Sequence, residues 1–172
     1  ESELKNIGVS KVLLDPNGIV YGWIPASSGL EGKKALGFIA HMDTAPAASG
    51  KNVKINVIPD YDGKDVELPG GVCIGVKDFP HLKGLAGRTL ITTDGTTLLG
   101  ADDKAGITEI MTAIETVIRD QIPHGPLCVA FTPDEEVGRG ADHFNVDLFG
   151  ADFAYTVDGG PENELACETF NA

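Results

Sequence analysis

The sequence lacks the features that mark several protein classes. No apolar stretch reaches the roughly 18 residues that a membrane-spanning helix needs, and the first residues do not form a secretory signal. The three cysteines, Cys73, Cys128 and Cys167, are far apart and make no Cys-x-x-Cys pair, which argues against a disulfide framework and a structural zinc knuckle. The absence of a Gly-x-Ser-x-Gly motif disfavours a serine hydrolase. Because the cysteines suggest no disulfide framework, we expect a reducing, cytoplasmic location.

Basic residues are scarce in the second half of the chain. Residues 87–172 contain 4 Lys and Arg against 16 Asp and Glu, whereas residues 1–86 contain 9 against 10. An acidic surface repels phosphate backbones and anionic lipids, so we expect neither a nucleic-acid nor a membrane partner. The chain has 172 residues, enough for one domain with a hydrophobic core. It does not begin with Met, and we interpret it as a fragment or a processed product of a longer protein.

Strand patterns recur along the chain. Apolar segments flank turn residues at 11–26 and again at 89–100, which predicts two β-hairpins. Continuous apolar runs at 33–41 and 126–133 are typical of strands buried on both faces, and Cys128 is then a buried small side chain. A further strand is expected at 151–160.

Two other kinds of segment lie between these strands. Residues 45–87 are rich in Gly, Pro, Lys and Asp, which indicates an irregular excursion with one or two hairpins. Apolar residues recur at helical spacing from Asp102 to Pro123, and a short helix is expected from Asp134 to about Phe144. The order of strands and helices predicts an α/β fold with a largely parallel, mixed sheet flanked by helices, incomplete at this chain length.

Polar side chains follow the predicted strands where each strand ends. These residues are His41, Asp43, Asp102, Asp103, Glu135, Glu136 and Asp158. Ligands of open α/β sheets collect beyond the carboxyl ends of the strands, so we expect these side chains to converge on one crevice. Each cluster alone is explained as well by a capped turn, a helix N-cap or a solvated turn. Their recurrence at equivalent strand ends favours a common site.

So many carboxylates in one crevice would raise one another's pKa values and destabilise the fold. A divalent cation would remove this penalty. One histidine with several carboxylates suits zinc, manganese or cobalt better than magnesium or calcium, which prefer oxygen ligands alone. A carboxylate can also bridge two ions, as in the two-metal sites that perform hydrolysis.

Four stretches resemble a known enzyme family in their order and separation. They are "HMDT", "TLLGADDKAG", "FTPDEEVG" and "YTVDGG". Together they resemble the dinuclear zinc exopeptidases, and among these the tripeptide aminopeptidases, from about Gly37 to Ala172. The resemblance implies a zinc-dependent hydrolase that releases the N-terminal residue from tripeptides.

The resemblance also implies a role for each residue of the site. The implied metal ligands are His41, Asp102, Glu136 and Asp158. Asp102 would bridge two zinc ions, and the peptide bond after it would be cis. Asp43 would hold the second imidazole nitrogen of His41. Glu135 would be the general base that takes a proton from the attacking water and returns it to the departing amine, while Asp134 stays a turn or cap residue.

The chain departs from the family in one important respect. The family needs a further histidine ligand near its C-terminus, and His81, His124 and His143 do not match it. Its lid domain, which provides dimer contacts, is also absent. We therefore expect residues 1–172 to be the N-terminal portion of a catalytic domain, without the lid and the C-terminal catalytic segment. Alone it would bind one zinc well and a second weakly and be inactive, whereas the complete protein would take small peptides and could dimerise through the lid.

Two alternatives stay open. The same dinuclear core serves amidases and deacylases that act on N-acyl amino acids. From a different class, the chain could be a cation-binding module without catalysis, although this leaves the two adjacent glutamates after a buried strand unexplained.

Overall fold

The computed structural model describes residues 1–160 and 164–166. The chain divides into two compact units. Unit 1 comprises Glu1–Asp43 and Asp102–Ala172, and unit 2 comprises Thr44–Ala101. Unit 2 contains the excursion predicted at 45–87. Cys167 lies outside the described residues, while Cys73 and Cys128 are free thiols, the first exposed and the second buried as predicted.

A five-stranded mixed sheet forms the centre of unit 1. Its strands, in spatial order, are β1 (Lys11–Leu14), β2 (Val20–Ile24), β8 (Leu127–Thr132), β3 (Leu36–His41) and β9 (Phe153–Thr156). β3 is parallel to both β8 and β9, whereas β2 is antiparallel to β1 and β8. The α/β fold with a mixed sheet is thus confirmed, and so is the first hairpin. In that hairpin the carboxylate of Asp15 accepts the N–H groups of Asn17 and Ile19.

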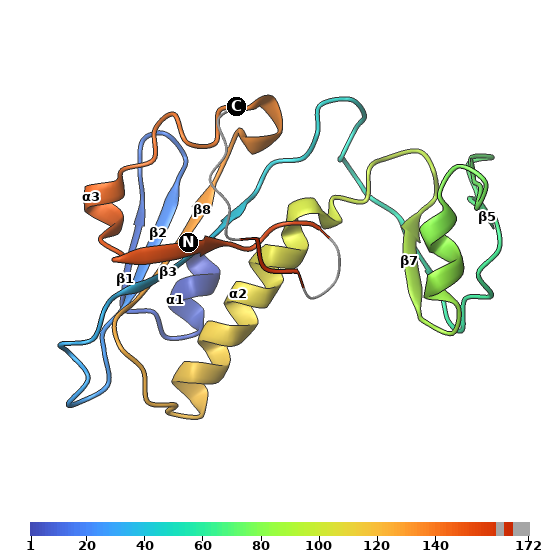
Figure 1. The fold of residues 1–172 in the computed structure, drawn as a ribbon. Coiled ribbons are helices and arrows are strands. Elements are labelled where there is room, and N and C mark those ends of the chain that lie inside the picture. The colour runs from blue at the N-terminus through green and yellow to red at the C-terminus, as the bar shows by residue number, and fades with distance from the viewer. Residues whose placement is uncertain (161–163, 167–172) are drawn as a thin grey trace. The chain divides into compact units, whose positions relative to one another are not determined.

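Helices cover both faces of this sheet (Figure 1). Their bounds are α1 (Ser2–Asn6), α2 (Ala101–Arg119) and α3 (Val146–Phe149). Ile110 and Ile114 of α2 pack with Leu4 of α1 on one face, and Phe149 of α3 packs on the other. All six residues of β8 are buried, and the first five alternate between the two cores because successive strand residues point to opposite faces.

The predicted helix over 134–144 is wrong. The structure has only a 3-10 turn, η2 (Glu135–Val137). Asp134 before it and Gly138 after it adopt left-handed backbone angles, with φ of 65° and 73°. A left-handed residue interrupts a right-handed helix, so one at each end confines the turn to three residues.

Unit 2 is built from short strands and one 3-10 helix. They are β4 (Ile55–Ile58), β5 (Val66–Glu67), β6 (Cys73–Ile74), β7 (Leu90–Thr93) and η1 (Pro80–Leu85). β5 and β6 form a hairpin, as expected for the excursion. The hairpin predicted over 89–100 is wrong, because β7 pairs antiparallel with the distant β4. After β7, the Thr93 hydroxyl donates to the Thr97 carbonyl and accepts the Gly95 N–H, which fixes a loop in place of a second strand.

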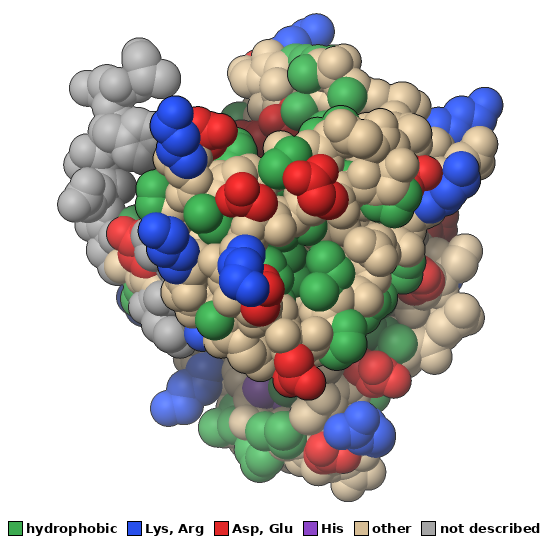
Figure 2. All heavy atoms as spheres, turned by 90° about the vertical axis from the view of Figure 1, so that its right-hand side faces the viewer, with side chains coloured by type: hydrophobic (Ala, Val, Ile, Leu, Met, Phe, Trp, Pro, Cys, Tyr) green, Lys and Arg blue, Asp and Glu red, His purple; other side chains and the backbone are tan. Residues whose placement is uncertain are grey.

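The core of unit 2 is small. Its buried members are Tyr61, Val66, Leu68 and Leu82. The other face of the β4–β7 pair exposes Ile55, Val57 and Ile91. Figure 2 shows hydrophobic side chains at the surface, with acidic and basic side chains scattered among them. No helix in the described part of the chain is long and apolar enough to cross a membrane.

Candidate metal centre

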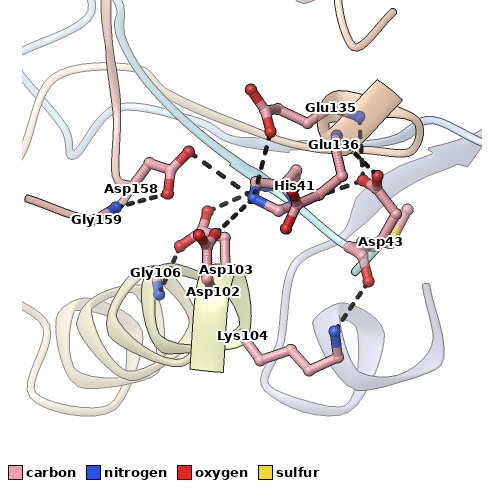
Figure 3. Close-up of polar contacts among 11 residues, drawn as sticks. His41, Asp43, Asp102, Asp103, Lys104, Gly106, Glu135, Glu136, Asp158 and Gly159 are labelled. Atoms are coloured by element: carbon pink, nitrogen blue, oxygen red, sulfur yellow. Dashed lines mark hydrogen bonds and ion pairs between the residues drawn. The ribbon is translucent and has the colours of Figure 1, made fainter. Parts of the chain in front are cut away.

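Parallel strands bring the candidate residues to one edge of the sheet in unit 1. β3, β8 and β9 run in the same direction, so their carboxyl ends lie at the same edge. His41 is the last residue of β3, η2 follows β8, and Asp158 lies two residues beyond β9. The start of α2 brings Asp102 to the same place (Figure 3). The structure therefore brings together the separated clusters singled out in the sequence.

The imidazole of His41 is the centre of the cluster. Its Nε2 lies 2.8 Å from Asp102 Oδ1 and 3.8 Å from both Glu135 Oε2 and Asp158 Oδ2. Three overlapping groups have ligand atoms within 4.8 Å of one another, namely His41–Asp102–Glu136, His41–Glu135–Asp158 and Asp102–Asp103–Asp158. Nitrogen and carboxylate oxygen donors so close together fit a divalent cation of the zinc, manganese or cobalt type.

The electrostatics of His41 favour a positive charge at this point. Burial lowers the pKa of His41, but the hydrogen bond to Asp102 and the charges of Asp158, Asp103 and Asp43 outweigh it and raise the pKa above the usual value. The carboxylates therefore stabilise a cation at the imidazole even though its side chain is almost fully buried. A bound metal ion would meet the same field.

Asp43 contacts more of the site than the sequence predicted. Its Oδ1 lies 3.3 Å from His41 Nδ1, yet within the described part of the chain this buried nitrogen has no hydrogen-bond partner. The carboxylate instead accepts the backbone N–H groups of Glu135, at 3.1 Å, and of Glu136, at 3.0 Å. Burial raises the pKa of Asp43, but these N–H groups outweigh it and lower the pKa. Asp43 thus fastens η2 to the end of β3.

The adjacent glutamates of η2 reach different parts of the cluster. Glu135 belongs to the group with Asp158, whereas Glu136 belongs to the group with Asp102. The side chain of Glu135 is 52% exposed, so solvent or a substrate can reach it. Both backbone N–H groups bind one carboxylate, which fixes the backbone from which the two side chains extend.

Asp103 makes a contact that the sequence did not reveal. The sequence placed it in the predicted crevice and suggested a helix cap, and its carboxylate does accept the Gly106 N–H at 3.1 Å. It also accepts the backbone N–H of His41 at 3.1 Å. Burial raises the pKa of Asp103. The peptide bond between Asp102 and Asp103 is cis, as the family resemblance implied. An Asp-Asp pair followed by glycine three residues later signals a cap, but no local signal identifies the contact with His41.

The other histidines lie elsewhere. His81 packs edge-on against the Phe79 ring in unit 2, and His124 Nδ1 lies 2.7 Å from the Gly125 carbonyl oxygen. His143 is exposed. Among residues 1–160 and 164–166, the possible metal-ligand groups contain no histidine other than His41.

Comparison with known proteins identifies relatives over the whole chain. No family model matches. The chain is 57% identical over 175 residues to Peptidase T of Desulfitobacterium hafniense strain Y51, which covers 100% of this chain and 42% of that protein. The chain is homologous to part of Peptidase T. It thus spans about two fifths of the length of the curated Peptidase T relatives it matches, each covered to 42%.

Two solved structures extend the similarity to Peptidase T into three dimensions. The aminopeptidase PepT of Bacillus cereus aligns with a TM-score of 0.66 at 26% identity, over 92% of this chain and 36% of that one. A tripeptidase of Staphylococcus aureus aligns with a TM-score of 0.65 at 26% identity, over the same shares. The relationship inferred from the four motifs is confirmed.

Proposed function

We propose that this chain supplies most of the metal site and the general base of a tripeptide aminopeptidase. One observation carries the proposal: carboxylates from three separate segments surround the Nε2 atom of His41. The identity to Peptidase T over the whole chain supports the same reaction class. The substrates would be small peptides with a free amino terminus.

Two zinc ions fit the proposed chemistry. His41, Asp102 and Asp158 would hold one ion, and Asp102 and Glu136 would contribute to the second. Zinc, when bound, supplies a Lewis acid that polarises a carbonyl and lowers the pKa of water. The second ion would need a further histidine from outside residues 1–172. We therefore propose that the chain is the N-terminal portion of the catalytic domain, completed by a lid domain and a C-terminal segment. We also propose that the complete protein is cytoplasmic and that it dimerises through the lid.

Glu135 is proposed to move the proton. Its carboxylate is exposed enough to face a substrate and lies close to the imidazole around which the ligands gather. It would take a proton from water as the oxygen attacks the scissile carbonyl. It would then give that proton to the nitrogen of the departing amine as the carbon–nitrogen bond breaks. Asp43 would hold Glu135 in position through the backbone N–H.

Substrate profiling of the complete protein tests this function. We expect hydrolysis of unblocked tripeptides, loss of activity on chelation, and recovery when zinc is restored. N-acetylated tripeptides should react poorly, since the free amino terminus would be recognised. Faster hydrolysis of N-acyl amino acids would reassign the protein to the deacylases. Activity that survives complete metal removal would contradict the metal mechanism.

Metal stoichiometry of residues 1–172 tests the division between the two ions. We expect one tightly bound zinc per chain, a weakly bound second one, and little or no peptide turnover. Two tightly held zinc ions in this chain by itself would contradict the proposal that the second ion depends on a ligand outside it.

A further inference from the structure

We propose that Asp103 is a positioning residue, which together with Gly106 sets the relative placement of His41, Asp102 and Asp158. The inference rests on the proposed function, in that it assumes a divalent ion at this cluster. Asp103 would act through the backbone of these segments, without itself being a ligand.

The first support is the way Asp103 joins two elements. One carboxylate oxygen accepts the N–H of His41, the last residue of β3, and the other accepts the N–H of Gly106 near the start of α2. These two residues are 65 positions apart in the sequence. Asp103 therefore fixes the end of β3 to the start of α2 (Figure 3).

The second support is the contrast between the adjacent carboxylates. The side chain of Asp102 is 65% exposed and contacts His41 Nε2. Asp103 is only 2% exposed, and both of its oxygens already accept backbone N–H groups. A buried carboxylate with these partners is suited to hold the structure, while its neighbour is free to bind an ion.

The third support is the close approach at Gly106. A methyl group on Gly106 would lie 1.9 Å from the Val157 carbonyl oxygen and 2.5 Å from Asp103 Oδ1. Val157 directly precedes Asp158, and its N–H donates to the Ile39 carbonyl of β3 at 2.8 Å. The N-terminal part of α2 therefore touches the segment that presents Asp158. Asp103 and Gly106 together therefore contact all three segments that would hold the first ion, namely the end of β3, the start of α2 and the segment that presents Asp158.

The test is ion binding by the Asp103→Asn variant of the complete protein. Asparagine keeps the shape but offers one acceptor, so its NH2 group would face a backbone N–H. We expect the affinity for Zn²⁺ to fall by about 10–100-fold, as for partners that orient metal ligands. The visible absorption spectrum of the Co²⁺-loaded protein should also change, because it reports ligand geometry directly and does not depend on turnover.

Asp152→Asn is the matched control. Asp152 accepts the Ala35 N–H at 2.6 Å, so it also joins β3 to a neighbouring segment, but at the opposite end of the β3–β9 pair. The Zn²⁺ affinity and the Co²⁺ spectrum of the Asp152→Asn variant should stay at wild-type values even if its melting temperature falls. If Asp103→Asn likewise loses only thermal stability, Asp103 is merely structural and the inference is overturned.

A second variant makes the test independent of the folding of Asp103→Asn. Gly106→Ala keeps the carboxylate but pushes against the Val157 carbonyl, so we expect weaker Zn²⁺ binding and an altered Co²⁺ spectrum. If the folded Gly106→Ala variant bound Zn²⁺ as tightly as the wild-type protein, the proposed positioning role of Asp103 and Gly106 would be contradicted. If the wild-type protein itself bound neither Zn²⁺ nor Co²⁺, the proposed function would fail, which is a different outcome from wild-type-like binding by the variants.

Discussion

The two units of the chain differ sharply in charge. Unit 2 has six acidic and six basic residues and is therefore neutral. The remaining 20 acidic and 7 basic residues belong to unit 1, which carries the whole net charge of −13. The candidate site lies entirely within unit 1. The acidity of the chain is thus a property of the unit that holds the site.

The units differ in where their carboxylates gather, although both have ion pairs at the surface. Asp62 pairs with Lys64 in unit 2, and Asp120 pairs with Arg119 in unit 1. In unit 1, four carboxylates lie around one buried histidine. Surface acidity by itself indicates little more than solubility. Carboxylates that converge on one point repel one another, and this concentration is what favours a cation site.

The largest expected effect is that of Glu135→Gln on the site of unit 1. Removing the proposed base should lower kcat by about 10²–10⁴-fold in the complete protein. Zinc content should not change, because Glu135 is not assigned as a ligand. Asp134→Asn is the matched control, since it changes the adjacent carboxylate and asparagine tolerates the positive φ of that position. Loss of zinc from Glu135→Gln would mean that the roles of Glu135 and Glu136 are exchanged.

The next effect compares the cores of the two units. Ile114 is 1% exposed in the core between α2 and the sheet, so Ile114→Ala should lower the free energy of unfolding by about 2–5 kcal/mol. Ile55 is 68% exposed on β4, so Ile55→Ala should change the free energy of unfolding by less than about 0.5 kcal/mol. Urea unfolding of both variants measures the difference. Equal losses of unfolding free energy in the two variants would contradict the exposure of Ile55 on the β4–β7 face.

A smaller effect is expected for the carboxylate that holds η2. Asp43→Asn leaves one acceptor for the two N–H groups of Glu135 and Glu136, so kcat should fall by about 10–100-fold. Asp15→Asn is a control for the loss of one carboxylate charge, because Asp15 accepts two backbone N–H groups on a single oxygen, in the β1–β2 turn away from the site. Equal activity of the two variants would remove the proposed role of Asp43.

The smallest effect concerns a carboxylate of unit 2. A hydrogen bond from the Thr96 hydroxyl, at 2.5 Å, is the main cause that lowers the pKa of Asp94 below its usual value. A lowered pKa in the folded state means that the stabilisation is present above the unfolded pKa and is lost as the pH falls through the folded pKa. Thr96→Ala removes the hydroxyl hydrogen bond, so the pKa of Asp94, measured by carboxyl NMR titration, should rise. An unchanged titration would contradict the contact.

Local patterns predicted the elements whose signals are local. The turn of the first hairpin, the apolar run of β8 and the helical spacing of α2 all gave the observed elements. The prediction failed over 89–100, because β7 pairs with β4, about 35 residues earlier in the sequence. It failed over 134–144 because two left-handed residues confine η2, and composition alone does not determine backbone angles.

The sequence by itself determined the chemistry of this protein: which side chains are available, in which order they occur, and that each cluster follows a strand. Only the tertiary structure decided how they meet. Parallel pairing of β3 with β8 and β9 brings the strand ends to one edge, so Asp43 contacts η2 from 92 positions away and Asp103 binds the backbone of His41 from 62 positions away. Such contacts depend on sheet pairing and burial across the whole unit, and no local sequence pattern records them.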